Sequence, residues 1–194
     1  MANPSLPVDS VEDLIAYAKS HPRMLHYASG GAGGPTQLAF VLFKITTGAE
    51  IIHAPYDGGA AALDAVAKDK AQVMLAPLVA ALPMVQDGKL RALAVSGEHP
   101  SSAAPDLPTI AETLPGFTAV AWFGVLAPAG TPAPVITRLS AEFDRIVHEP
   151  DVEKQFAALG GEPVGGSPAS FAAFIHVEIA KWIRVAKEAG IHIE

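Results

Sequence analysis

The sequence contains no cysteine and little charge. Without cysteine, disulfides, thiolate metal sites and cysteine nucleophiles are excluded. Only 17% of the 194 residues are charged, the formal net charge is −7, and the 13 Lys and Arg residues are scattered rather than clustered. Because nucleic acids and anionic membranes attract clustered positive charge, both are disfavoured as partners.

Long hydrophobic runs and metal-binding histidine pairs are also missing. The most apolar run, Val73 to Val85, is too short to span a bilayer and contains Pro77 and Pro83. No two of the seven histidines lie four residues apart on one expected helix, so neither a metal nor a cofactor is expected. The polar start MANPSLPVDS does not resemble a signal peptide, which predicts a cytoplasmic protein if the sequence is the complete gene product.

Apolar residues, in contrast, make up half of the chain. This share is high for a small soluble domain, and it predicts that another chain covers part of the surface. We therefore expect a homo-oligomer.

The most informative stretch runs from Leu25 to Thr47. It predicts a buried strand at Leu25–Ala28, a glycine loop at Ser29–Gly34 and a helix that begins at Pro35. The backbone N–H groups of such a loop and helix start, with the positive end of the helix dipole behind them, favour an anion.

Two known phosphate motifs fail in this loop. A P-loop needs Lys-Ser/Thr where Pro35-Thr36 stand, and a dinucleotide fingerprint needs glycine in place of Thr36. A carboxylate is therefore the favoured ligand, and a close-packed turn without a ligand is the alternative.

Strands and helices alternate after this stretch. The further expected elements are strands at Glu50–Ala54, Gln72–Leu75 and Leu90–Val95, with helices at Ala60–Ala67 and Pro77–Val85. The order predicts an α/β fold with a parallel sheet, whose carboxyl edge carries the glycine loop and a second loop at Pro55–Gly59. Later in the chain we expect a strand at Ala119–Ala127 and helices at about 131–147, 150–159 and 168–189.

Several short motifs together resemble one family. They are Tyr27-Ala28-Ser29 with its glycine loop, Pro55-Tyr56-Asp57-Gly58, Ala81-Leu82-Pro83, Gly88 to Val95, Asp106 to Glu112, Trp122-Phe123-Gly124, Ala127 to Pro132, Gly161 to Gly166 and Phe171 to Trp182. As a set they resemble the solute receptors of tripartite tricarboxylate transporters, the TctC or Bug proteins.

This resemblance implies a type II periplasmic-binding-protein-like fold, which traps a small carboxylate between two lobes and delivers it to a membrane permease. It implies a periplasmic location. Residues 4–117 resemble a complete second lobe with a parallel-rich sheet flanked by helices. Residues 118–194 resemble the C-terminal strand and helices of a first lobe whose N-terminal part is absent from the sequence.

The helices of residues 118–194 would then have no sheet of their own to cover. Leaving large apolar side chains such as Phe143 and Trp182 in water forfeits about 1.5 to 3 kcal/mol each. We expect a second copy or another polypeptide to cover them, with exchange of the C-terminal segment as one route.

The resemblance also implies the binding residues. Those that match are Ser29, Gly31, Gly33, Thr36, Tyr56, Asp57 and Gly58. Ala76-Pro77 departs from the family pattern and removes two polar side chains from the cleft edge. Two alternatives stay open: a small-acid hydrolase that uses Ser29, His53 and Asp57, and an interaction module that has lost ligand binding.

Overall fold

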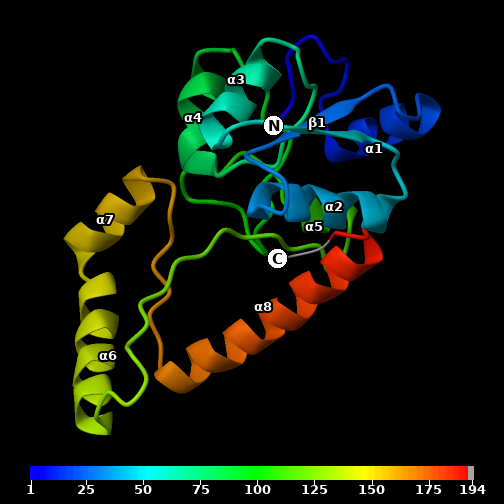
Figure 1. Ribbon diagram of the computed structural model, residues 1–194. Helices are drawn as coiled ribbons and strands as arrows, with labels where there is room; N and C mark the ends of the chain where they lie inside the picture. Colours follow the sequence, from blue (N-terminus) through cyan, green and yellow to red (C-terminus); the bar gives the residue numbers. More distant parts are fainter. Residues whose placement is uncertain (192–194) are drawn as a thin grey trace. The chain divides into compact units, whose positions relative to one another are not determined.

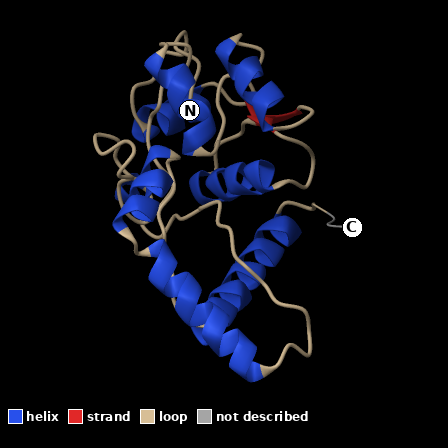
Figure 2. Cartoon of the chain, turned by 90° about the vertical axis from the view of Figure 1, so that its left-hand side faces the viewer, coloured by secondary structure: helices blue, strands red, loops and turns tan. Residues whose placement is uncertain are grey.

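The computed structural model describes residues 1–191 and divides into two compact units. The first unit combines residues 1–121 with the chain from Val185 onward, and the second comprises Trp122–Arg184. Helices dominate, and strands are few (Figure 2). No helix among residues 1–191 is long and apolar enough to cross a membrane. The proposed lobe boundary after residue 117 stays a prediction.

The elements follow the expected α/β order in the first unit (Figure 1). They are α1 (Val11–Ser20), β1 (His26–Ser29), α2 (Pro35–Thr47), β2 (Ile52–Pro55), α3 (Gly59–Ala67), α4 (Leu78–Gln86) and α5 (Ile110–Thr113). The second unit contains α6 (Ala133–Val147), α7 (Pro150–Ala158) and most of α8 (Pro168–Glu188).

Local signals in the sequence explain where the first helices begin and end. The Asp13 N–H donates to Ser10 Oγ at 3.0 Å, so Ser10 is the N-cap of α1. Pro35 occupies the first turn of α2, where a missing N–H costs nothing. Gly48, with φ of 69°, ends α2 in the left-handed conformation that favours glycine.

The sheet is built around β1. Strand β2 pairs with it in parallel, with Tyr27 opposite His53. Single bridges extend the sheet on the other side: Tyr27 pairs with Val73 in parallel, and Ala2 pairs antiparallel with both Val73 and Arg91. The segments expected as strands at 72–75 and 90–95 therefore contribute single bridges, and this part of the prediction is wrong.

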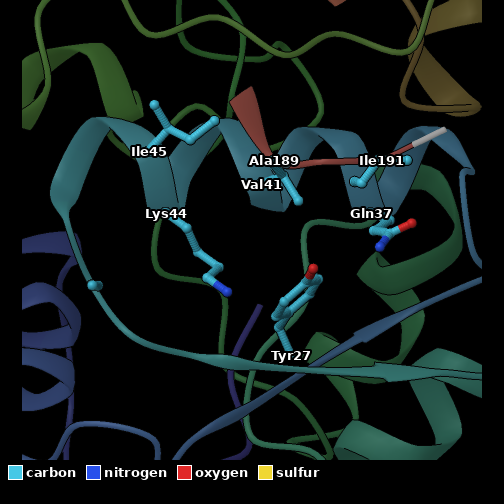
Figure 3. Close-up of a pocket in the computed structure, with 8 residues that line it drawn as sticks. Tyr27, Gln37, Val41, Lys44, Ile45, Ala189 and Ile191 are labelled. Atoms are coloured by element: carbon cyan, nitrogen blue, oxygen red, sulfur yellow. The ribbon is translucent and has the colours of Figure 1, made fainter. Parts of the chain in front are cut away.

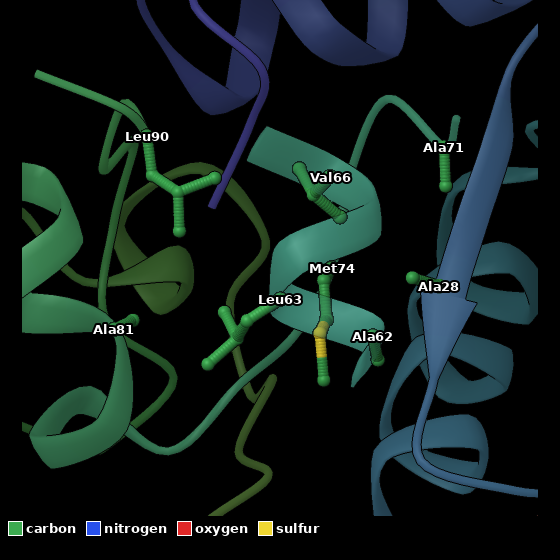
Figure 4. Packing of buried hydrophobic residues seen from close by; sticks show 8 residues of the cluster. All are labelled: Ala28, Ala62, Leu63, Val66, Ala71, Met74, Ala81 and Leu90. Atoms are coloured by element: carbon green, nitrogen blue, oxygen red, sulfur yellow. The ribbon is translucent and has the colours of Figure 1, made fainter. Parts of the chain in front are cut away.

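Each face of β1 packs on a different helix, because side chains alternate along a strand. Tyr27 faces α2, where its ring stacks on Phe40 with 4.3 Å between centroids. Ala28 faces the opposite way, into a core cluster with Ala62, Leu63 and Met74 (Figure 4). The sheet thus lies between α2 and α3 (Figure 1).

The second unit has little buried surface. The strand expected at Ala119–Ala127 is wrong: within the described chain this segment joins no strand, and residues 121–130 are exposed. An extended apolar segment needs a neighbouring strand to accept and donate its backbone hydrogen bonds. Of this segment, only Ala119 has a backbone acceptor, since its N–H donates to Ser96 O at 3.0 Å. Trp122 contacts Phe171 and Phe174 edge-on. Helices α6 and α7 have no buried residue.

Two methionines offer a matched test of the core. Met74 is 1% exposed and Met24 is 68% exposed. We expect Met74→Ala to lower the free energy of unfolding by about 2 to 5 kcal/mol, because it leaves a cavity. Met24→Ala should change it by less than about 0.5 kcal/mol. Urea denaturation measures both, and equal effects would contradict this core assignment.

Candidate anion-binding site

The site lies where the two glycine loops meet. Because β1 and β2 are parallel neighbours, the loops that follow them leave the same edge of the sheet. The Tyr56 N–H donates to Ser29 O at 3.0 Å and joins the two loops. Gly30 packs so closely on the second loop that a Cβ at this position would lie 2.9 Å from Gly59 N.

Two helices begin at this junction without a side-chain cap. Gly34 is the N-cap of α2 and Gly58 is the N-cap of α3, and neither has a side chain that could bond to the first-turn N–H groups. Within residues 1–191, the N–H groups of Thr36 and Gln37 have no protein acceptor. The first turns of both helices also lack acidic residues, so no carboxylate within them offsets the two positive helix-dipole ends. Asp57 directly precedes the Gly58 N-cap of α3.

Three of the four glycine N–H groups of the first loop, in contrast, have internal acceptors. Gly30 N–H donates to Thr36 Oγ1 at 3.0 Å, and Gly33 N–H donates to Gln37 Oε1 at 2.5 Å. Gly31 N–H makes a longer bond to Ser29 Oγ at 3.4 Å. The donors that are free for a ligand therefore belong to the helix starts rather than to Gly30, Gly31 and Gly33.

A series of hydrogen-bonded polar side chains, buried or partly buried, holds the first loop in place. Ser29 Oγ lies 2.7 Å from His53 Nε2, and His53 Nδ1 lies 3.2 Å from Gln37 Nε2. The His53 ring also stacks on Tyr27, with 4.8 Å between centroids. Three neighbouring elements, β1, β2 and α2, are thus joined through polar side chains.

This geometry does not support the hydrolase alternative. Ser29 is 0% exposed, and its hydroxyl donates to Gly31 O at 3.0 Å. A hydrolytic triad needs a carboxylate to orient the histidine, but an amide from Gln37 faces His53 Nδ1. Asp57 lies exposed on the second loop and is not part of this chain of contacts.

Burial shifts the ionisation of the groups around this chain. Burial, followed by the charge of Lys44, lowers the pKa of His53, which keeps the ring neutral at neutral pH. Burial raises the pKa of Tyr27 to about 12, partly offset by a hydrogen bond from Gln37. Burial also lowers the pKa of Lys44, partly offset by Glu50.

A cavity of about 370 Å³ lies beside α2 (Figure 3). Its lining residues are Tyr27, Gln37, Val41, Lys44, Ile45, Ala49, Ala189 and Ile191. Lys44 Nζ lies 5.6 Å from the centroid of the Tyr27 ring, a cation–π distance. The loop junction is open to solvent, because its glycines Gly33, Gly58 and Gly59 are exposed.

The expected binding residues fall into two groups. Ser29, Gly31, Gly33 and Thr36 lie in or beside the first loop, where Ser29 and Thr36 are internal acceptors. The second loop holds Tyr56, which is half-buried, and Asp57 and Gly58, which are exposed. The φ of 90° at Gly58 requires glycine.

Sequence reasoning missed the role of Gln37. A signal for it exists: Gln37 is the polar residue one turn before Val41 on a helix that is otherwise apolar on this face. Gln37 is nevertheless buried, and a buried amide needs partners for its oxygen and its nitrogen. Gly33 and His53 supply them.

Comparison with known families agrees with this α/β lobe. Residues 1–191 match the family described as the tripartite tricarboxylate transporter family receptor. The chain belongs to this family. Protein BugT of Bordetella pertussis is 33% identical over 195 residues, which cover 100% of this chain and 60% of BugT. The chain spans only 56% to 60% of the length of the first curated relatives.

Solved structures of similar proteins have the same fold, that of periplasmic binding proteins. The R. palustris protein Rpa4515 with adipate is 38% identical, with a TM-score of 0.86 over 98% of this chain and 64% of that chain. MatC from Rhodopseudomonas palustris with bound malate is 28% identical, with a TM-score of 0.78 over 95% and 64% of the two chains. The periplasmic binding protein BugD is 25% identical, with a TM-score of 0.80 over 100% and 66%. The expected family and fold are confirmed.

The contact between the two loops can be tested with two glycines. Gly30→Ala should lower the free energy of unfolding by about 1 to 3 kcal/mol, because the new methyl group collides with the Gly59 backbone. Gly59→Ala is the control, since nothing lies within 4 Å of a Cβ there. Thermal denaturation compares the two, and a Gly30→Ala protein as stable as Gly59→Ala would refute the close contact.

Proposed function

We propose that this chain binds a small organic carboxylate at the paired starts of α2 and α3, as part of a solute receptor. The observation that carries the proposal is the junction itself, where two uncapped helix starts lie beside each other with unpaired N–H groups. A carboxylate satisfies these donors and is stabilised by both helix dipoles.

The relatives support a carboxylate rather than another anion. Rpa4515 was solved with adipate and MatC with malate, both of which are dicarboxylates. We extend this ligand class to the present chain through its family membership. Ser29 and Thr36 shape the first loop, while Tyr56, Asp57 and Gly58 form the second wall. Asp57 suits a ligand that also carries an ammonium group.

The partnership with a membrane permease and a periplasmic location are part of the same proposal. They rest on the family, whose description is that of a transporter receptor, and on BugD, which is a periplasmic binding protein. In such a system the receptor captures the acid and carries out no chemistry.

A carboxylate placed by mutation should compete with the ligand. Gly34→Asp puts an N-cap carboxylate beside the Thr36 and Gln37 N–H groups, and the backbone at φ −76° and ψ 165° accepts this residue. We expect Gly34→Asp to abolish the rise in melting temperature that adipate or malate produces in the wild type. Its own stability should be equal or higher by a few tenths of a kcal/mol.

Gly34→Ala is the matched control, because it adds a methyl group but no acceptor, at 3.4 Å from Gly31 O. It should keep the ligand-induced rise in melting temperature. A Gly34→Asp protein that responds to dicarboxylates like the wild type would refute the helix-start site. A wild type that responds to none at millimolar concentration would refute the carboxylate function.

We also propose that another polypeptide covers the apolar side chains of the second unit, with a second copy as the first candidate. Phe143 and Phe174 are 44% and 42% exposed, and Ile179 and Ile183 are more than half exposed. Such a concentration of exposed apolar residues is typical of an interface.

Light scattering after size-exclusion chromatography tests whether a second copy covers these side chains. We expect a dimer or larger assembly, which Phe143→Glu together with Phe174→Glu shifts towards the monomer. A wild-type monomer that binds no hydrophobic dye would contradict the proposal.

A further inference from the structure

We propose that Gln37 and His53 are positioning residues of the carboxylate site, and that protonation of His53 releases the glycine loop. The inference rests on the proposed function, since it concerns regulation of the same site. It follows from the direction in which each hydrogen bond between the loop and His53 must run.

The Gly33 N–H fixes the orientation of the Gln37 amide. A backbone N–H only donates, so the atom that it meets at 2.5 Å must be the amide oxygen, Oε1. The Gln37 Nε2 group is therefore the one that faces His53 Nδ1 at 3.2 Å. Because an amide nitrogen only donates, Nδ1 must be the unprotonated, accepting nitrogen of the ring.

The proton of neutral His53 then lies on Nε2. The Nε2–H group donates a hydrogen bond to Ser29 Oγ at 2.7 Å, and the Ser29 hydroxyl donates one to Gly31 O at 3.0 Å. All bonds thus run in one direction, from Gly33 through Gln37, His53 and Ser29 back to Gly31. The chain begins and ends on the same glycine loop.

A second proton on His53 breaks this chain at one point. Protonated Nδ1–H and the Gln37 Nε2–H group would both be donors and would repel each other. Gln37 must then turn away, and Gly33 N–H loses its acceptor. The loop that leads into α2 then keeps its bond from Gly30 N–H to Thr36 Oγ1 but loses the one at Gly33, next to the helix start. The Thr36 and Gln37 N–H groups are held less firmly as a result.

The surroundings of His53 favour the neutral ring. Tyr27 stacks on it from β1, and Lys44 on α2 adds a positive charge. No carboxylate among the described residues acts on its ionisation. The pKa of His53 is lowered in the fold, so the stability that the neutral ring contributes is fully present above its usual value of about 6.5 and is lost as the pH falls through the lowered value.

Nitrogen-15 NMR of the histidine rings tests the tautomer without any ligand. At pH 7.5 we expect His53 to carry its proton on Nε2 and to titrate below the usual histidine value of about 6.5. In Gln37→Glu, the carboxylate can accept from both Gly33 N–H and a protonated Nδ1–H. This variant should therefore raise the pKa of His53 above its value in the wild type.

Hydrogen exchange and binding test the effect on the loop. In Gln37→Ala, the Gly33 amide should exchange at least tenfold faster at pH 7.5, and adipate and malate should bind about tenfold more weakly. In the wild type, the affinity for the same acids should fall as the pH drops below 6.5 and through the lowered pKa of His53. His53→Gln, which cannot titrate, should show only the smaller fall that protonation of the acids themselves produces.

The outcomes separate this inference from the proposed function. His53 protonated on Nδ1 at pH 7.5, or an unchanged His53 titration in Gln37→Glu, would overturn the inference even if dicarboxylates bind. A second outcome is that no dicarboxylate binds, while the tautomer, the titration in Gln37→Glu and the Gly33 exchange are as expected. The role of Gln37 and His53 in holding the glycine loop is then supported, and the carboxylate function is refuted.

Discussion

The parallel pairing of β1 with β2 is the constraint on which the rest of the first unit depends. It brings the two following loops to one edge of the sheet, where Gly30 lies against the backbone of Gly59. Any side chain at residue 30 would separate the loops and, with them, the starts of α2 and α3. The anion site is therefore a property of strand pairing first and of particular side chains second.

Much of this arrangement could be predicted from the sequence. Pro35 and Gly48 mark the ends of α2 by backbone conformation alone, and the alternation of strands and helices implies the shared loop edge. The internal acceptors of the loop could not be predicted in this way. Whether Thr36 Oγ1 points at Gly30 N–H or at a ligand depends on distances of a few ångströms that no sequence pattern specifies.

The wrong strand predictions have different physical causes. Residues 72–75 have neighbours on both sides, since Val73 bridges to Tyr27 and to Ala2, but the pairing extends over single bridges only. Residues 119–127 have the apolar composition of a strand, but a strand also needs a neighbour with free backbone groups, and Ala119 alone donates to one, Ser96 O. Residues 121–127 lie exposed, and the chain spans 60% and 56% of the length of two curated relatives. The composition of a segment shows whether it can form a strand, and the backbone segments beside it decide whether it does.

The position of Ala2 between Val73 and Arg91 has a consequence for how the chain folds. These pairings join residues about 70 and 90 positions apart, and the side-chain amide of Asn3 donates to Val66 O across a similar separation. Closing such long loops is entropically costly and slows folding. Ala2 must therefore wait for Arg91, 89 residues later in the chain, before this part of the sheet can close.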